Sequence, residues 1–194
     1  MKRDFKNWSD EELIKEFQDN NTLEAYEMLV KRYKDPLMNF VYRFVGDREV
    51  AVDIVQDTMI KFYLKKDSYQ TIAKFSTWLY TIAANLAKNE IKRRNRRSFL
   101  SLNKDNEDGP NVQVADSKVI APERSAHNKM MEEVVQRALL KVKPVYREMV
   151  ILRDIEGFSY EEIAEMRNMS LGTVKSRINR GRNQLKKLLQ KYYE

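Results

Sequence analysis

The chain has 194 residues, and its 36 Lys and Arg residues against 29 Asp and Glu give a formal net charge of +7. Hydrophobic residues make up 42% of the sequence and cysteine is absent, so the chain can bury a core but can form neither disulfides nor thiolate metal sites. The basic balance makes polyanions the first class of partner to consider. Charges interrupt every apolar run, so we expect no secretory signal, no membrane span and a cytoplasmic protein.

The first part of the sequence predicts a helical domain over residues 1–97. Ser9, followed three residues later by Glu12, has the spacing of a capping box and predicts a helix start. Proline is tolerated at the first position of a helix, so Asp35–Pro36 predicts another start, and Gly46 predicts a helix end. Apolar residues with the helical period predict the core: Leu29, Val30, Tyr33, Leu37, Phe40, Val41 and Phe44.

An acidic segment follows, GDREVAVDIVQDTMIKFY. Its apolar residues can face inward, and the other side of the helix is acidic. Acidic side chains repel DNA, so this side would suit a basic protein partner, although an ordinary solvated helix face explains the same charges. The acidic residues are Asp47, Glu49, Asp53 and Asp57.

A basic helix with aromatic residues is predicted next, over FSTWLYTIAANLAKNEIKRRNRR. Asn85 and Asn89 lie one turn apart on it, on one face. Cations bind phosphates, aromatic rings stack on bases and Asn amides can bond a flipped base, so this helix suits single-stranded or distorted nucleic acid. Taken alone, Trp78 fits a core position better, and cations also stabilise a helix C-terminus without any ligand. The cations are Lys88, Lys92, Arg93, Arg94, Arg96 and Arg97.

The composition changes sharply over SFLSLNKDNEDGPNVQVADSKVIAP, where Gly, Pro, Asn, Asp and Ser replace the apolar period. This segment predicts a flexible linker at 98–123 and a second helical domain at 124–194. The expected fold class is therefore all-α, with two small helical domains on a tether.

The second domain has the signals of a helix-turn-helix. A helix that begins at Pro144 is closed by Gly157, and Ser159 with Glu162 forms a second capping box. Two short helices are predicted to follow, separated by only a few residues, with Ser170 as the cap of the second.

The second of these helices, predicted over 171–189, has one basic and polar face. Such a face can lie in a major groove, where short polar groups and Arg meet base edges and Lys meets phosphates. A solvated basic face is the alternative. The polar residues are Thr173, Lys175, Ser176, Arg177, Asn179, Arg180 and Arg182.

Three segments in this order and spacing resemble the bacterial RNA polymerase sigma factors of the extracytoplasmic-function (ECF, group IV) type in the sigma-70 class. They are AVDIVQDTMIKFY, FSTWLYTIAANLAKNEIKRR and FSYEEIAEMRNMSLGTVKSRINRGRNQLKKLL. The resemblance implies sigma domain 2 at 1–97 and a four-helix sigma domain 4 at 124–194. Together these would bind core RNA polymerase, read the −35 and −10 promoter elements and help to melt the −10 element.

The resemblance also implies partners and site residues. The partners are core RNA polymerase (the clamp helices of its largest subunit and the flap of the second largest), promoter DNA and an anti-sigma factor. No catalytic residue, metal, cofactor or membrane insertion is implied. The resemblance assigns docking on the polymerase to Asp53, Gln56 and Asp57. Contacts with the −10 element fall to Trp78, Asn85, Lys88, Asn89, Lys92 and Arg93. Contacts with the −35 element fall to Ser170, Thr173, Lys175, Ser176, Arg177, Asn179 and Arg180.

The chain departs from the family pattern in places. Arg167 stands where the helix-turn-helix pattern usually has an apolar residue, which predicts a wetter turn. The loop DSYQTIAKF lacks the glycine often found before the FxTWL motif, and Asn179 replaces an aromatic residue of some members.

Three other classes stay open on the sequence. One is a dimeric helix-turn-helix regulator that binds a palindrome unaided. The second is an enzyme, for which the chain offers the lone histidine His127 and no cysteine. The third is a general RNA-binding protein.

Overall fold

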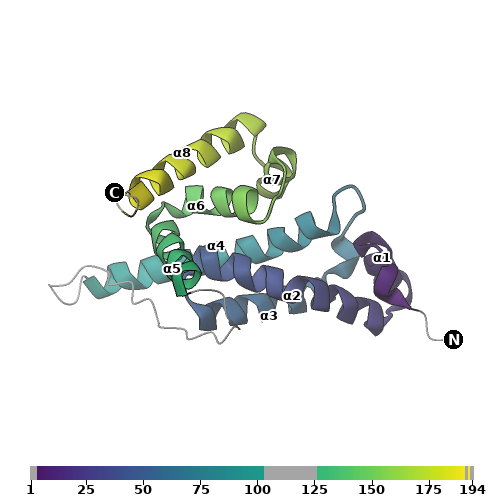
Figure 1. Cartoon of the computed structure of the whole chain (residues 1–194). Helices are drawn as coiled ribbons and strands as arrows, with labels where there is room; N and C mark the ends of the chain where they lie inside the picture. Colours follow the sequence, from purple (N-terminus) through teal and green to yellow (C-terminus); the bar gives the residue numbers. More distant parts are fainter. Residues whose placement is uncertain (1–3, 103–125, 191, 193–194) are drawn as a thin grey trace.

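The computed structural model describes residues 4–102, 126–190 and 192, and every element in these residues is helical (Figure 1). The predicted all-α class is confirmed. Most of the predicted linker at 98–123 lies outside the described residues. Its first residues belong to the preceding helix, which continues to Leu102 because nothing in SFLSL breaks the helical backbone.

Four α-helices build the first domain. They are α1 (Asp10–Asn20), α2 (Leu23–Val45), α3 (Arg48–Leu64) and α4 (Phe75–Leu102), with short 3-10 turns η1 (Phe5–Asn7) and η2 (Lys66–Ser68). The capping box at the start of α1 is confirmed, since the Ser9 and Glu12 side chains each accept a bond from the other's backbone N–H. Gly46 ends α2 as predicted, in the left-handed conformation at φ +79°.

The helix start predicted at Asp35–Pro36 is wrong, because Pro36 lies inside α2. A proline in a helix interior removes one hydrogen bond and crowds the preceding turn. Here buried residues on both sides of it, Leu29 and Leu37 among them, hold the two halves against the same core. Packing therefore carries the helix through a residue that would end it in isolation.

The second domain contains α5 (Ala126–Lys141), α6 (Pro144–Val150), α7 (Tyr160–Arg167) and α8 (Leu171–Gln190), with a π-helical turn, η3 (Ile151–Ile155), continuing α6. The second capping box is confirmed, with the Ser159 Oγ accepting from the Glu162 N–H at 3.0 Å. The Ser170 Oγ accepts from the Thr173 N–H at 3.3 Å and caps α8. The helix-turn-helix is thus present as α7 and α8.

The two domains pack directly against each other (Figure 1), with α5 and α6 against α2 and with α7 against α4. One apolar cluster contains buried residues of both domains, such as Phe44 of α2 and Leu139 of α5. The Gln136 amide of α5 also donates to the Tyr42 carbonyl of α2 at 3.3 Å. The described parts of the chain therefore form one closed body rather than two separated lobes.

Arg147 joins the ends of two helices at this contact. Its Nη1 donates to the Phe44 carbonyl near the end of α2 at 2.6 Å. Its Nη2 donates to the carbonyls of Leu140 and Val142, at and just beyond the end of α5, at 2.8 and 3.1 Å. Burial lowers the pKa of Arg147 to about 10. Carbonyls at helix C-termini carry partial negative charge, so they solvate the buried guanidinium in place of water.

Candidate polymerase and nucleic-acid interfaces

The residues predicted to dock on the polymerase lie together on the outer face of α3. Asp53, Gln56 and Asp57 are all exposed and are spaced three or four residues apart, which places them on one side of the helix. The predicted acidic side is smaller than the sequence indicated. Asp47 caps α3 through the Val50 N–H at 3.1 Å and pairs with Arg94 at 2.9 Å, so it serves the fold.

An apolar row on the same face of α3 was missed in the sequence. Val52, Ile60 and Leu64 are exposed by 39%, 55% and 72%, and they continue the line of Gln56 at intervals of four residues. Apolar side chains in a row beside acidic ones are typical of a protein interface with a charged rim. The sequence contained this information, because Val52, Ile60 and Leu64 do not share the helical spacing of the α3 residues that are buried in the core.

The residues predicted to contact the −10 element lie on α4. Asn85, Lys88, Asn89 and Lys92 are exposed and share one face of the helix. Arg93 is also exposed, but its Nε pairs with the Glu90 carboxylate at 2.6 Å, so its guanidinium is less available to bind a phosphate.

Trp78 is half-buried in a cluster of aromatic rings. Its ring centroid lies 6.0 Å from that of Phe62, 5.6 Å from that of Tyr69 and 5.9 Å from that of Phe75. These contacts fit a core position, with only part of the indole left for a base to stack on.

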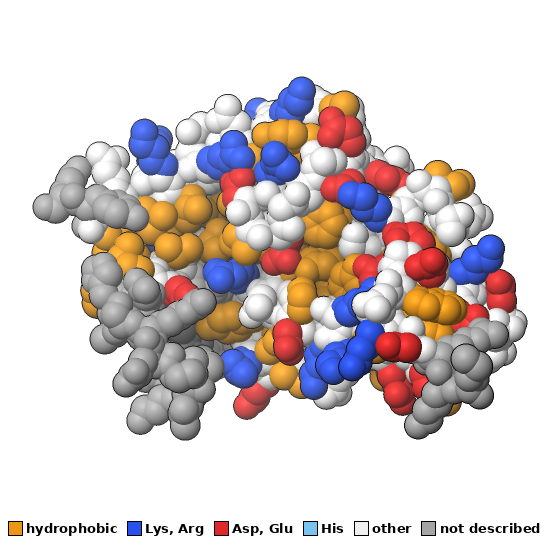
Figure 2. Space-filling model, turned by 45° about the vertical axis from the view of Figure 1, so that its right-hand side comes forward, with side chains coloured by type: hydrophobic (Ala, Val, Ile, Leu, Met, Phe, Trp, Pro, Cys, Tyr) orange, Lys and Arg blue, Asp and Glu red, His pale blue; other side chains and the backbone are white. Residues whose placement is uncertain are grey.

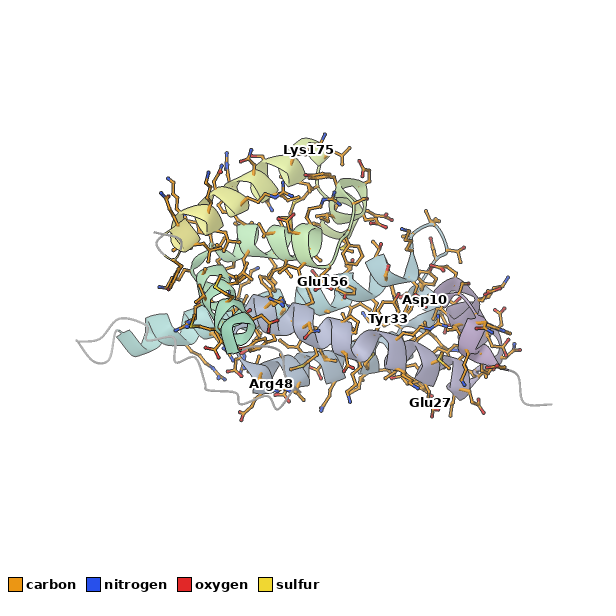
Figure 3. All side chains as sticks on the ribbon, in the orientation of Figure 1. Asp10, Glu27, Tyr33, Arg48, Glu156 and Lys175 are labelled. Carbon is orange, nitrogen blue, oxygen red and sulfur yellow. The ribbon has the colours of Figure 1, made fainter. Side chains whose placement is uncertain are left out.

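The face of α8 predicted to read the −35 element is turned outward. Figure 3 shows Lys175 on the side of α8 away from α4. Lys175, Ser176, Asn179 and Arg180 are exposed, and Arg180 donates to the Tyr146 hydroxyl at 3.3 Å. This hydrogen bond lowers the pKa of Tyr146.

Three residues near this face hold the helix-turn-helix together. The Ser170 and Thr173 hydroxyls lie 2.9 Å apart, and the Arg177 guanidinium donates to the Met169 sulfur at 3.2 Å. These three residues therefore organise the turn. Ser170 is exposed, whereas Thr173 and Arg177 are half-buried, and Arg177 lines a hollow together with Lys88 of α4 and Glu148 of α6. Arg182 pairs with Asp154 at 2.5 Å and is tied to its own domain.

In Figure 2 basic side chains lie along the upper edge of the molecule, and acidic ones gather toward its right-hand end.

The turn around Arg167 is not wetter, contrary to the sequence prediction. The Arg167 side chain is only 5% exposed, with its Nε 3.1 Å from the Glu148 carboxylate. Its Nη1 donates to the Asn85 Oδ1 of α4 at 2.9 Å. The first domain covers the turn, which a local sequence pattern does not reveal.

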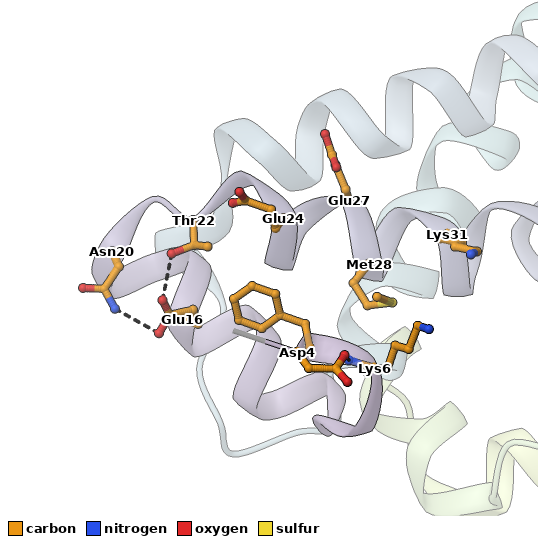
Figure 4. Close-up of a pocket in the computed structure, with 10 residues that line it drawn as sticks. Asp4, Lys6, Glu16, Asn20, Thr22, Glu24, Glu27, Met28 and Lys31 are labelled. Carbon is orange, nitrogen blue, oxygen red and sulfur yellow. Dashed lines mark hydrogen bonds between the residues drawn. The ribbon is translucent and has the colours of Figure 1, made fainter. Parts of the chain in front are cut away.

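A hollow of about 720 Å³ lies between η1, the end of α1 and the first turns of α2 (Figure 4). Glu27 and Met28 line it, and the Glu16 carboxylate at its edge accepts from Asn20 and Thr22. It contains none of the predicted site residues. Within the described residues no group of three or more potential metal ligands occurs. The His127 side chain lies outside what the structure describes.

Within the described residues, no helix has the length and apolar character needed to cross a membrane.

Comparison with known proteins matches both domains. The model of Sigma-70 region 2 matches residues 29–97, and that of Sigma-70, region 4 matches residues 132–185. The chain is 35% identical over 170 residues to the ECF RNA polymerase sigma factor SigW of Bacillus subtilis, covering 86% of this chain and 90% of the relative. It is 33% identical over 168 residues to the ECF RNA polymerase sigma-E factor of Escherichia coli, covering 86% and 87%.

Among solved structures, the chain is similar to the sigma factor RpoE from Bartonella quintana, in a co-crystal with the anti-sigma factor NepR. The TM-score is 0.68 at 26% identity, over 86% of this chain and 98% of that chain.

These matches, with an all-helical pair of domains and a helix-turn-helix, define a transcription initiation factor of the sigma-70 class. Within that class, the chain belongs to the ECF RNA polymerase sigma factors. The resemblance found in the sequence is confirmed, and the dimeric regulator is not favoured.

Proposed function

We propose that the chain binds core RNA polymerase through the outer face of α3 and directs initiation at promoters with its own −35 and −10 elements. The proposal rests on the presence of both sigma regions in one chain. Region 2 has an exposed face of acidic and apolar residues on α3, and region 4 has a helix, α8, with exposed basic residues. Polymerase docking is assigned to Asp53, Gln56 and Asp57. The exposed row of Val52, Ile60 and Leu64 would add apolar area to this contact.

Promoter opening is assigned to α4. Melting costs about 1.4 kcal/mol for each stacked step, so a few opened pairs require several kcal/mol. Capture of unpaired bases by Asn85 and Asn89, with phosphate contacts from Lys88 and Lys92, can supply energy of this size without a nucleotide cofactor. The chain itself would contribute no catalytic group, because RNA synthesis belongs to the polymerase.

Duplex DNA is assigned to α8, with the −35 bases and phosphates meeting Lys175, Ser176, Asn179 and Arg180. The flap of the second-largest polymerase subunit is the partner proposed for this domain. The proposed place of action is the cytoplasm, where promoters and core polymerase are found. The complex of RpoE with the anti-sigma factor NepR supports an anti-sigma partner for this chain too.

Reconstitution with core polymerase on a pool of genomic fragments tests the proposal as a whole. Defined start sites that depend on the chain are the expected result. A footprint on DNA without polymerase would favour a free-standing regulator, and the absence of any chain-dependent start site would contradict the proposal.

Asp53→Ala is expected to raise the Kd for core polymerase by about fivefold to tenfold, or about 1–1.4 kcal/mol, because an exposed acidic contact is lost. Titration of the labelled chain with core polymerase measures the change. Asp19→Ala, which removes an exposed carboxylate of α1, is the matched control and should leave the Kd unchanged. An unaltered Kd for Asp53→Ala would remove this docking assignment.

Arg180→Ala is expected to lower use of promoters that depend on a −35 element by about tenfold, since one good contact with DNA contributes about 1–3 kcal/mol. Run-off transcription from start sites found in the reconstitution measures this effect. Lys186→Ala removes another exposed cation of α8, further along the helix, and serves as the control. Equal losses for both variants would show a general charge effect rather than a reading contact.

A further inference from the structure

The first helix of the chain, α1, packs against the start of α4 and against the short turn η2 (Figure 1). The match to Sigma-70 region 2 begins at residue 29, so α1 lies before the matched part of the chain. None of the residues assigned above to polymerase or promoter lies on α1. Its polar contacts with the segment between α3 and α4 indicate what this helix contributes.

Gln18 of α1 and Lys66 of η2 form a reciprocal contact. The Gln18 Nε2 donates to the Lys66 carbonyl at 2.7 Å and to the Tyr69 carbonyl at 3.1 Å. In return the Lys66 Nζ donates to the Phe17 carbonyl at 2.7 Å, to the Gln18 carbonyl at 3.2 Å and to the Asn21 Oδ1 at 2.6 Å. Carbonyls in the last turn of a helix carry partial negative charge, so the Lys66 ammonium also stabilises the end of α1. The backbone from Lys66 to Tyr69 is thereby fixed to α1.

A second contact from α1 reaches the first residue of α4. The Glu11 Oε1 accepts from the Phe75 N–H at 3.2 Å. The first N–H groups of a helix have no partner within it, so this carboxylate satisfies one of them, and its negative charge is favourable at that end of the helix. Gln18 and Glu11 therefore anchor α1 to both ends of the loop that joins Tyr69 to Phe75.

This loop depends on its anchors, because its tip is not packed. Residues 70–72 are exposed. The Tyr69 hydroxyl donates to the Ala73 carbonyl at 2.8 Å and closes the loop across its base. A segment with few buried contacts opens at low free energy unless polar contacts hold it. The hydrogen bonds from α1 therefore determine how rigidly the loop and the first turn of α4 are held.

The anchored segment adjoins the proposed −10 surface. The ring centroids of Tyr69 and Phe75 lie 5.6 and 5.9 Å from that of Trp78. Trp78, Asn85 and Lys92 are spaced seven residues apart, or about two helical turns, so Trp78 continues the row of polar residues toward the start of α4. An unpaired strand that follows this row from Asn85 toward the start of α4 would reach the indole, whose exposed part is available for a base to stack on.

We infer that α1 holds the −10 surface in position for promoter opening, with Gln18 and Glu11 as positioning residues that fix Tyr69 and Phe75 and, through them, Trp78. This inference rests on the proposed function. A surface that is already ordered captures an unpaired base more tightly, because no part of the binding free energy is consumed in ordering it. The polar contacts of α1 would thus add to the energy available for melting.

Opening of a duplex promoter and of a pre-melted promoter by the complete holoenzyme tests this role. Gln18→Ala is expected to lower opening of the duplex about fivefold, since each hydrogen bond contributes a factor of about two to ten. Permanganate reactivity of the unpaired thymines measures the opening. On the same promoter with a mismatched −10 element, run-off transcription at saturating polymerase should stay close to the wild-type level, because the melting cost is absent. The Kd for core polymerase should not change, because the docking residues lie on α3.

Glu11 provides a second variant with a conservative rescue, which keeps the test valid should Gln18→Ala fail to fold. Glu11→Ala removes the acceptor at the start of α4 and is expected to lower duplex opening about threefold. Glu11→Gln keeps an oxygen that can accept from the Phe75 N–H and should open the promoter nearly as the wild type does. Asn20→Ala is the matched control, because this exposed amide donates to Glu16 within α1, at 3.0 Å, and its loss should leave opening unchanged.

Equal losses on the duplex and pre-melted promoters, or a raised Kd for core polymerase, would show a general loss of structure and would overturn the positioning role. Wild-type opening by both alanine variants would overturn it too, as would a Glu11→Gln chain that opens as poorly as Glu11→Ala. In each of these cases, start sites that depend on the wild-type chain would still support the proposed function. The absence of such start sites with the wild type would overturn the proposed function itself, and this inference with it.

Discussion

Replacing Arg147 with methionine is expected to lower the free energy of unfolding by about 2–4 kcal/mol, because hydrogen bonds from a charged group contribute about 1.5–3 kcal/mol and a buried acceptor left unpaired costs about 1–3 kcal/mol. The variant leaves the Phe44, Leu140 and Val142 carbonyls without their donor, and a buried carbonyl without a partner keeps its desolvation cost. Denaturant unfolding followed by circular dichroism measures the loss.

Arg137→Met is the control, since it makes the same exchange at an exposed position of α5 and should change the stability by less than about 0.5 kcal/mol. A loss below about 1 kcal/mol for Arg147→Met would mean that water reaches these carbonyls. The contact between α2 and α5 would then be weaker than the three hydrogen bonds indicate.

Gly181→Ala is expected to lower the free energy of unfolding by about 2–3 kcal/mol. Gly181 is buried where α8 crosses α6, and a Cβ there would lie 2.5 Å from the Val150 Cγ2 and 3.0 Å from the Tyr146 carbonyl oxygen. The backbone oxygen has no rotamer to escape into, so α8 must move away from α6.

Gly172→Ala provides a matched comparison on the same helix, because a Cβ at Gly172 meets nothing within 4 Å. Alanine favours the helix over glycine, so this variant should be neutral or more stable, by up to about 1 kcal/mol. Thermal unfolding of both variants measures the difference. Equal melting temperatures would show that the α6–α8 contact tolerates a methyl group and would contradict the packing described.

Local features were predictable from the sequence because neighbouring residues determine them. The capping boxes at Ser9 and Ser159, and the end of α2 at Gly46, depend only on side chains within one turn. Family motifs added the two regions and their order. The polar faces of α4 and α8 followed from helical spacing alone.

Features that depend on distant parts of the chain were not predictable in this way. Pro36 continues α2 because other helices hold both halves of it, and Asp47 is drawn from the acidic side by Arg94 of α4. Arg167 is buried because a second domain lies on it, with Glu148 and Asn85 as its partners. No periodicity within a single helix contains that information.

The apolar cluster shared by the two domains has a consequence for the lifetime of the protein in the cell. When the domains separate, buried side chains such as Phe44 and Leu139 lose part of their cover, and each 100 Å² of apolar surface wetted costs about 2.5 kcal/mol. A molecule whose domains separate without polymerase would expose this apolar surface to proteases and chaperones, whereas the packed arrangement covers it. Unbound molecules whose domains stay packed together should therefore be degraded slowly, and degradation should mainly affect unbound molecules whose domains have separated.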